Sequence, residues 1–339
     1  MDCGIIGASG YGGTELLRLL CGHSNLEVAV ACAGTQAGVR VAEHTPALAA
    51  AYPELRYAAT DVAAVDGLDV VFLALPHGQS QDLVPDLLDR VGLVVDLAAD
   101  FRLGDPATYA EWYGEPHRQP DLLDRFTYAL PELNRAALPG ARALAIPGCY
   151  PTAATLALVA FAEAGLLEGS TVVVDAVSGL SGAGRGPSER LHFAHASDDV
   201  VAYGLLHHRH TIEMERNLGA EILFTPHLAP MARGMAATCY VRLGAGQLES
   251  TEAAMALLTE RFAAEPFVVV TDAPPSTKAT LGSNCCLVSA QVDPRTGFLV
   301  AMSSLDNLVK GAAGAAIQAA NVALGFEETT GLPIIGLYP

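Results

Sequence analysis

Residues 2–13 read DCGIIGASGYGG, and this stretch decides the fold of the amino-terminal half. The apolar residues of 2–7 have a strand pattern, and the helical spacing of Thr14–Leu20 follows the glycines. Gly7 permits a tight turn and Gly10 lets the backbone approach a pyrophosphate, which the N–H groups of the helix N-terminus then bind. The order of strand, glycine turn and helix predicts a Rossmann-type dinucleotide-binding domain. A glycine-rich turn with no ligand is the alternative.

The second predicted strand, Glu27–Cys32, bears on which dinucleotide is bound. It ends in AGTQAGVR at residues 33–40, where an NAD site usually places an acidic residue that binds the ribose hydroxyls. No acidic residue stands there, which favours NADP(H). Thr35, with Gln36 or Arg40, is our candidate for holding the additional phosphate.

Two further apolar runs, 69–75 and 93–97, indicate strands of a parallel sheet that is covered on both faces. Ligands of such sheets bind beyond the carboxyl ends of the strands. Pro76, His77 and Asp100 follow those ends and are therefore candidates for residues near the site. His77 is equally well explained as an ordinary loop histidine.

The segment AIPGCYPT, residues 145–152, places Cys149 before an alanine-rich helical run that extends from Thr152 to Glu163. Pro151 suits the first position of that helix. The N–H groups and macrodipole of a helix N-terminus favour a thiolate, which is the nucleophilic form of cysteine. The alternative is that Cys149 is a small buried hydrophobic residue, as most intracellular cysteines are.

Composition excludes several classes of protein. The 339 residues predict about two domains, and the net charge of −18 disfavours nucleic acid and anionic membranes as partners. No apolar stretch reaches the ~18 residues of a spanning helix. The seven cysteines show neither zinc spacing nor a disulfide framework, so we expect a soluble cytoplasmic protein without a metal.

The carboxyl-terminal half contributes two more candidate segments. Residues 178–186, SGLSGAGRG, form a glycine-rich loop after a predicted strand over 170–177, and Arg185 in it suits a phosphate or carboxylate. His208, Arg209 and His210 precede a helix that we expect to begin with Thr211 as its N-cap. A histidine there would serve as the proton-transfer partner of a cysteine nucleophile. A surface histidine cluster is one alternative, and metal binding is a weaker one.

The whole chain closely resembles the N-acetyl-gamma-glutamyl-phosphate reductase family. The motifs that carry the resemblance are GASGYGGTELLRLL (7–20), DLAADFRL (96–103), YALPELNR (128–135), IPGCYPT (146–152), SGLSGAGR (178–185), HRHTIE (208–213) and DNLVKGAAGAA (306–316). Two positions depart from the family pattern: Ile212 replaces a usual proline, and Ala98 replaces a usual serine. Neither departure removes a proposed catalytic group.

The resemblance implies an α/β protein with two domains. A Rossmann domain over residues 1–148 would bind NADP(H), with a C-terminal helix of about 305–339 packed on it. Residues 149–304 would form an α+β catalytic and dimerisation domain like that of glyceraldehyde-3-phosphate and aspartate-semialdehyde dehydrogenases. The family is usually a homodimer or a homotetramer.

The chemistry implied is the reduction of an acyl phosphate in arginine biosynthesis. Cys149 would form a thioester, NADPH would reduce it, and a histidine would handle the proton, with His208 our first choice over His210. The implied cofactor contacts are Gly7, Ser9, Gly10, Tyr11, Gly12, Thr35, Pro76, Ser178, Gly179 and Asn307. The implied substrate contacts are Arg102, Arg185, Arg209 and Asn284.

Two other functions remain open at this point. The first is reduction of another acyl phosphate, either aspartyl phosphate or a carrier-bound aminoadipyl phosphate. The second is a non-enzymatic module that senses NADP through a redox-responsive cysteine, which leaves the histidine segment unexplained.

Overall fold

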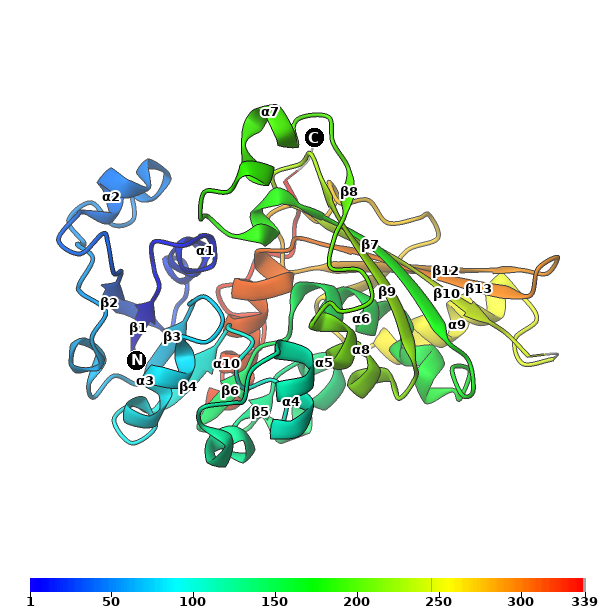
Figure 1. The fold of residues 1–339 in the computed structure, drawn as a ribbon, viewed down its shortest axis with the longest axis horizontal. Coiled ribbons are helices and arrows are strands. Elements are labelled where there is room, and N and C mark those ends of the chain that lie inside the picture. The colour runs from blue at the N-terminus through cyan, green and yellow to red at the C-terminus, as the bar shows by residue number, and fades with distance from the viewer. Residues whose placement is uncertain (245, 338–339) are drawn as a thin grey trace. The chain divides into compact units, whose positions relative to one another are not determined.

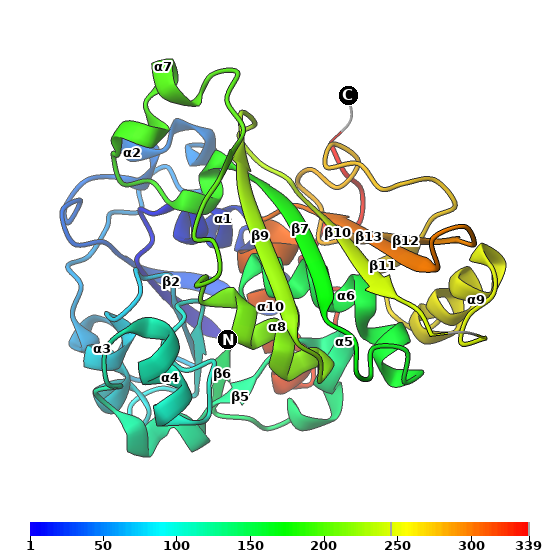
Figure 2. The ribbon, with the colours of Figure 1, turned by 45° about the vertical axis from the view of Figure 1, so that its right-hand side comes forward.

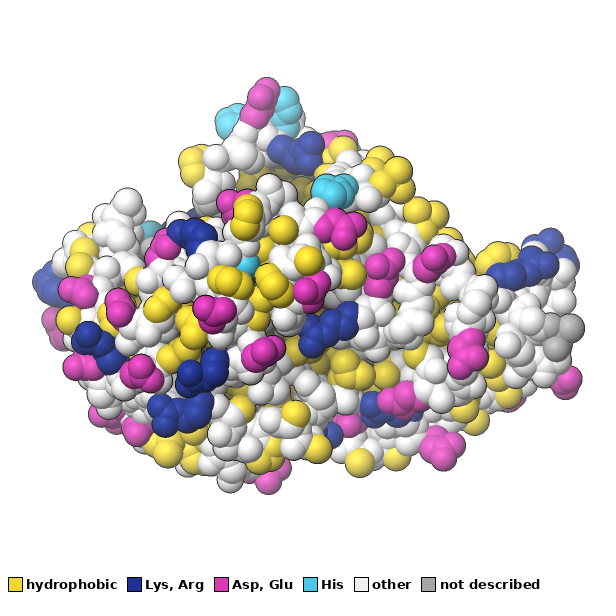
Figure 3. Space-filling model, turned by 60° about the horizontal axis from the view of Figure 1, so that its bottom comes forward, with side chains coloured by type: hydrophobic (Ala, Val, Ile, Leu, Met, Phe, Trp, Pro, Cys, Tyr) yellow, Lys and Arg dark blue, Asp and Glu magenta, His cyan; other side chains and the backbone are white. Residues whose placement is uncertain are grey.

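A computed structural model describes residues 1–244 and 246–337. The chain divides into two compact units, each with its own sheet. Unit 1 comprises Met1–Pro147 and Ala312–Leu332, and unit 2 comprises Gly148–Gly311 and the segment from Pro333 onward. No helix in the described ranges is long and apolar enough to cross a membrane. On the face drawn in Figure 3, basic side chains are interspersed with acidic ones and do not gather into one patch.

Unit 1 contains a six-stranded sheet in the order β2-β1-β3-β4-β6-β5, and all of its pairs are parallel. The strands are β1 Asp2–Ile6, β2 Glu27–Cys32, β3 Val70–Leu73, β4 Leu93–Asp96, β5 Thr127–Tyr128 and β6 Ala143–Ala145. Every residue of β3 and β4 is buried, as the continuous apolar runs predicted.

The helices of unit 1 cover the sheet, and all except α10 connect its strands (Figure 1). They are α1 Tyr11–Leu20, α2 Val41–His44, α3 Ser80–Leu87, α4 Pro106–Tyr113, α5 Pro131–Asn134 and α10 Gly314–Leu324, with 3-10 turns at Pro46–Leu48, Val62–Val65, Pro120–Arg125 and Arg135–Ala137. Strands followed by crossover helices in a parallel sheet form the predicted Rossmann-type arrangement.

Unit 2 contains a mixed seven-stranded sheet in the order β11-β12-β13-β10-β7-β9-β8. The strands are β7 Val172–Gly179, β8 Val201–Ala202, β9 Ile222–Ala229, β10 Met235–Arg242, β11 Val268–Val270, β12 Cys286–Asp293 and β13 Phe298–Leu305. Helices α6 (Cys149–Glu163), α8 (His210–Leu218) and α9 (Thr251–Phe262) lie against one face of this sheet (Figures 1 and 2). Burial alternates along β7, β9 and β10, so side chains on the opposite face are only partly covered.

The connection between β7 and β8 projects from one end of the sheet of unit 2, and both ribbon views show it (Figures 1 and 2). It contains short helical turns at Leu180–Ala183 and Glu189–Leu191, and the short helix α7 at Phe193–Ala196. Large apolar side chains in this connection are exposed, among them Phe193 at 82%.

Three expected helix limits were wrong. Helix α6 begins at Cys149, so Pro151 is its third residue, which still lies in the first turn where backbone N–H groups have no helical partner. Helix α8 begins at His210, so Thr211 is not its N-cap. The C-terminal helix is shorter than expected, because a π-turn over Val309–Ala313 precedes α10 and Gly325, with a φ of 73°, ends it after Leu324.

Candidate active site

Cys149 is the first residue of α6, directly after the N-cap Gly148. The helix is buried along most of its length, whereas Cys149 is partly exposed. The first-turn N–H groups and the positive end of the helix dipole therefore lie at the sulfur, where they stabilise an anion. By contrast, burial raises the pKa of the Cys3 thiol to about 12 and that of Cys32 to about 11.

Gly148 brings the imidazole of His210 against the backbone next to Cys149. A Cβ at position 148 would lie 2.4 Å from His210 Nε2, so the space that a side chain would need is filled by the histidine ring. The N–H of Gly148 donates a hydrogen bond of 3.1 Å to Glu213 Oε2, and Glu213 is 1% exposed. Both His210 and Glu213 belong to α8, which therefore holds this turn from its side.

A second glycine packs against Cys149 itself. A Cβ on Gly311 would lie 2.8 Å from the Cβ of Cys149. Gly311 belongs to the π-turn Val309–Ala313, a rare geometry that is frequent at functional sites. Gly311 of the DNLVKGAAGAA motif thus makes room for the nucleophile.

The imidazole ring of His208 makes different contacts from that of His210. Its Nδ1 accepts a hydrogen bond of 3.1 Å from the backbone N–H of His210, at the start of α8. Its ring also meets Tyr150, Tyr203 and Phe224 edge to face. Burial, with a smaller contribution from the charge of Arg209, lowers the pKa of His208 to about 4, so the ring is neutral at physiological pH.

These residues line a cavity of about 300 Å³ within unit 2. Its wall consists of Cys149, Tyr150, Ser178, Gly182, Ala183, Ser188, Arg190, Leu191, Tyr203, His208, Arg209, His210 and Leu228. The structure therefore brings together five residues that the sequence singled out: Cys149, Ser178, His208, Arg209 and His210.

Two tyrosine hydroxyls extend the polar wall of the cavity. Tyr203 donates to the Tyr150 hydroxyl at 3.3 Å, and Tyr150 donates to the His227 carbonyl at 2.9 Å. Burial raises the pKa of Tyr203 to about 12, so its hydroxyl stays protonated at neutral pH. Tyr150 follows Cys149 directly, and this chain of hydrogen bonds fixes the ring beside the nucleophile.

The other candidates in unit 2 have structural contacts of their own. Asn307 accepts from the Gly234 N–H at 2.8 Å and donates to Ser181 Oγ at 2.9 Å, so it holds two loops together. Gly179 is required by close packing, because its Cβ would lie 2.8 Å from the Met231 carbonyl oxygen. Asn284 is fully buried, and Arg185 is exposed and is not among the residues that line the cavity.

The glycine turn of unit 1 fits a dinucleotide. Gly7 has a φ of 87°, and its Cβ would lie 2.3 Å from the Ala74 carbonyl oxygen, so only glycine is accommodated there. Gly10 is the N-cap of α1, and no side chain caps that helix. A ten-residue helix whose N-terminus carries no side-chain cap suits a ligand phosphate. Ser9, Tyr11 and Gly12 belong to the same turn.

Two arginines lie beside the segment that follows β2. Arg40 forms an isolated bridge with Arg56, and Arg56 donates to the Gly38 carbonyl at 2.8 Å. Arg40 also pairs with Glu43 at 2.7 Å, while Thr35 is exposed. This region of unit 1 therefore contains two cations and the Thr35 hydroxyl at the end of β2.

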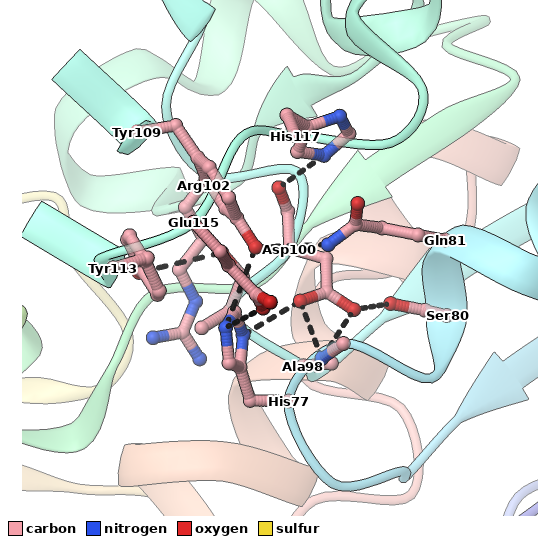
Figure 4. Close-up of polar contacts among 12 residues, drawn as sticks. His77, Ser80, Gln81, Ala98, Asp100, Arg102, Tyr109, Tyr113, Glu115 and His117 are labelled. Atoms are coloured by element: carbon pink, nitrogen blue, oxygen red, sulfur yellow. Dashed lines mark hydrogen bonds and ion pairs between the residues drawn. The ribbon is translucent and has the colours of Figure 1, made fainter. Parts of the chain in front are cut away.

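The carboxyl ends of β3 and β4 are joined by a network around Asp100 (Figure 4). Its carboxylate pairs with His77 Nδ1 at 2.6 Å and accepts from Ser80 Oγ at 2.5 Å and from the Gly78 N–H. The ring of His77 also lies 4.7 Å from that of Tyr113. The turn that contains Pro76 is fixed by this network, and His77 is more than an isolated loop residue.

Arg102 and Asp96 complete the network. Arg102 is 7% exposed and donates to the Leu97 carbonyl at 3.0 Å. Burial, aided by the charge of Asp100, raises the pKa of Asp96 to about 7. Burial acts in the same direction on Asp100, but the hydrogen bonds from His77, Ser80 and Gly78 outweigh it and lower the pKa of Asp100 to about 2.

Comparison with known proteins identifies the family. A model of the semialdehyde dehydrogenase NAD-binding domain matches residues 2–141, and one of the semialdehyde dehydrogenase dimerisation domain matches residues 149–307. N-acetyl-gamma-glutamyl-phosphate reductase from Ectopseudomonas mendocina is 43% identical over 344 residues, with 99% of each chain covered. The chain belongs to the N-acetyl-gamma-glutamyl-phosphate reductase family. The relative of that name from Symbiobacterium thermophilum is 45% identical, again with 99% of each chain covered.

Solved structures share the fold of this reductase family at lower identity. Aspartate semialdehyde dehydrogenase II from Vibrio cholerae, complexed with ASA, superimposes with a TM-score of 0.71 and 16% identity, covering 95% of this chain and 97% of that one. The two-domain architecture expected from the sequence, a Rossmann domain with a mixed-sheet dimerisation domain, is confirmed.

Several residues of the candidate sites in the two units were not identified from the sequence of this reductase. Glu213 follows His210 by three positions, so the two share a face of α8, and that spacing was a usable signal. Arg190 and Tyr203 line the cavity through a long connection whose path has no signature in the sequence. Arg56 meets Arg40 through an isolated bridge between distant segments.

Proposed function

We propose that this protein catalyses the NADPH-dependent reduction of N-acetyl-L-glutamyl 5-phosphate to the 5-semialdehyde and phosphate in arginine biosynthesis. The observation that carries the proposal is Cys149 at the N-terminus of α6, in one cavity with His208, Arg209 and His210. Relatives at more than 40% identity over the full chain bear the name of this activity.

The sulfur of Cys149 attacks the acyl carbon, and the C–O bond to phosphate breaks, which leaves a thioester. When bound, NADPH supplies the hydride that reduces the thioester carbon. Backbone N–H groups at the start of α6 stabilise the negative oxygen that develops there. Collapse of the resulting tetrahedral adduct releases the aldehyde and returns the sulfur.

We assign the proton transfer to His210 rather than to His208. The Nε2 edge of His210 packs on Gly148, next to the nucleophile. His208 has Nδ1 engaged by the His210 N–H and a pKa of about 4, so it is a poor proton acceptor at neutral pH. Its role is to hold the start of α8, with its neutral ring facing substrate.

The cofactor is NADP(H) in this proposal. Gly7, Gly10 and the N-terminus of α1 hold the pyrophosphate, while Thr35, Arg40 and Arg56 hold the 2′-phosphate. Because hydride must reach the carbon on Cys149, we keep Ser178, Gly179 and Asn307 as contacts near the nicotinamide. The variant Arg56→Gln should raise KM for NADPH roughly 10-fold and leave KM for NADH unchanged. Equal effects on both would refute the assignment.

We also propose that the protein is a homo-oligomer that associates through unit 2. The dimerisation-domain model covers this unit, and the face of its sheet opposite α6, α8 and α9 is only partly covered. Val173 and Tyr240 lie on that face. Light scattering of the wild type should give a dimer or a tetramer, and Tyr240→Glu should reduce the mass.

The decisive experiment is phosphate-dependent reduction of NADP with N-acetylglutamate semialdehyde, compared with aspartate semialdehyde. The proposal expects the first aldehyde to be preferred by orders of magnitude in kcat/KM. Preference for aspartate semialdehyde would indicate that the substrate is aspartyl phosphate. Absence of turnover with both, with NADP still bound, would favour the sensing module. In Cys149→Ser, turnover should be abolished while NADPH still binds.

A further inference from the structure

The turn Glu189–Leu191, in the connection between β7 and β8, forms part of the wall of the Cys149 cavity. Arg190 and Leu191 line this cavity together with Ser188. Arg185, the arginine that the glycine loop suggested as a substrate contact, is not among the lining residues. The connection therefore brings a different cation to the cavity from the one expected.

The guanidinium of Arg190 is available to a ligand. Its side chain is exposed, and among the described residues no hydrogen bond or ion pair engages it. Its charge acts on the Tyr203 hydroxyl, which bonds to Tyr150 next to Cys149. A cation that lines the nucleophile's cavity and has no ion-pair partner among the described residues attracts an anion.

Arg190 also marks the end of that cavity. An adjoining hollow of about 400 Å³ is lined by Glu189, Arg190, His195, Asp199 and Val201. Arg190 is the one described residue that borders both hollows, and none of Cys149, His208 and His210 borders the second. Arg190 thus lies at the boundary between the nucleophile's cavity and a hollow that the nucleophile does not border.

The substrate of the proposed function has an anion at each end. Its phosphate is attached to the carbon that Cys149 attacks, and its α-carboxylate lies at the opposite end of the carbon chain. We infer that Arg190 binds this α-carboxylate and so determines specificity for an N-acylated amino acid over an aldehyde without the carboxylate. A guanidinium pairs with a carboxylate through two parallel hydrogen bonds, which fixes the substrate's orientation as well as its charge.

The reverse reaction tests this inference, which rests on the proposed function, because aldehyde and phosphate then enter as separate substrates. In Arg190→Gln, KM for N-acetylglutamate semialdehyde should rise roughly 10- to 100-fold, the loss expected for a charged hydrogen-bonded pair. KM for phosphate and for NADP should stay at the wild-type value. Arg190→Lys keeps the charge but not the two parallel hydrogen bonds, so its KM for N-acetylglutamate semialdehyde should lie between those of wild type and Arg190→Gln.

A truncated aldehyde provides the readout that a structural role would not change. Wild type should have a lower kcat/KM for 4-acetamidobutanal, which lacks the carboxylate, than for N-acetylglutamate semialdehyde. Arg190→Gln should leave the kcat/KM for 4-acetamidobutanal unchanged and lower only that for N-acetylglutamate semialdehyde, so the variant should no longer discriminate between the two aldehydes. Arg295→Gln, at an exposed hairpin turn, is the matched control with full discrimination.

Two results would overturn the inference. One is that Arg190→Gln discriminates between N-acetylglutamate semialdehyde and 4-acetamidobutanal as strongly as wild type does. The other is that Arg190→Gln raises KM for phosphate and leaves KM for the aldehyde unchanged. Wild type that turns over neither aldehyde would instead contradict the proposed function, and this inference would fall with it.

Discussion

Replacing Gly148 with alanine tests whether the His210 ring is the group that serves Cys149. The backbone at Gly148 has φ −67° and ψ 154°, which alanine adopts without strain, so the obstacle is the ring alone. The new Cβ would lie 2.4 Å from His210 Nε2, whereas ordinary contacts begin at 3.4 Å. The ring must therefore retreat by about 1 Å, a displacement that typically lowers the rate by about 100-fold.

The assay separates chemistry from folding. We expect kcat for phosphate-dependent NADP reduction to fall about 100-fold. The free energy of unfolding should change by about 1 kcal/mol or less, since Gly148 is an N-cap without a side-chain bond. Gly22→Ala is the matched control, because its Cβ would meet only the Leu19 carbonyl oxygen, at 3.9 Å. A Gly148→Ala enzyme that keeps most of its kcat would refute the role of His210.

Three further outcomes follow from burial and pKa. Iodoacetamide at neutral pH should label Cys149 with loss of activity, and leave Cys3 unlabelled, because burial raises the pKa of Cys3 to about 12; mass spectrometry of digests checks this. In His208→Asn, stability should fall less than in wild type between pH 6.5 and 5, by at most about 2 kcal/mol, because the unfolded wild-type chain takes up a proton at His208 that the folded protein does not. An unchanged pH dependence of urea unfolding would contradict this. In Asp96→Asn, the stability relative to wild type should increase as pH rises from 5 to 8. The reason is that Asp96 keeps its proton in the folded protein up to about pH 7, whereas the unfolded chain releases it at lower pH. Thermal melting at each pH tests this, and a constant difference in Tm between variant and wild type would argue against it.

The sequence by itself determined the elements and the chemistry that each motif supplies. Gly7 and the pattern around it specify a tight strand-to-helix turn because only glycine tolerates its φ of 87° and the approach of Ala74. Cys149 was predicted at a helix N-terminus because an alanine-rich run of helical spacing follows it and because the fixed φ of Pro151 suits the first turn of a helix. These are short-range effects, and short-range effects can be inferred from neighbouring residues.

Only the tertiary structure decided which side chains meet in the cavity. That His210 rather than His208 packs on Gly148, and that Arg190 rather than Arg185 lines the wall, depends on how α8 and the β7–β8 connection pack on α6 and the sheet. Such contacts join residues tens of positions apart, and alternation or helical spacing within one segment does not encode them. The environments that separate the pKa values of Asp96 and Asp100 arise in the same way, from burial and hydrogen bonds that distant residues supply.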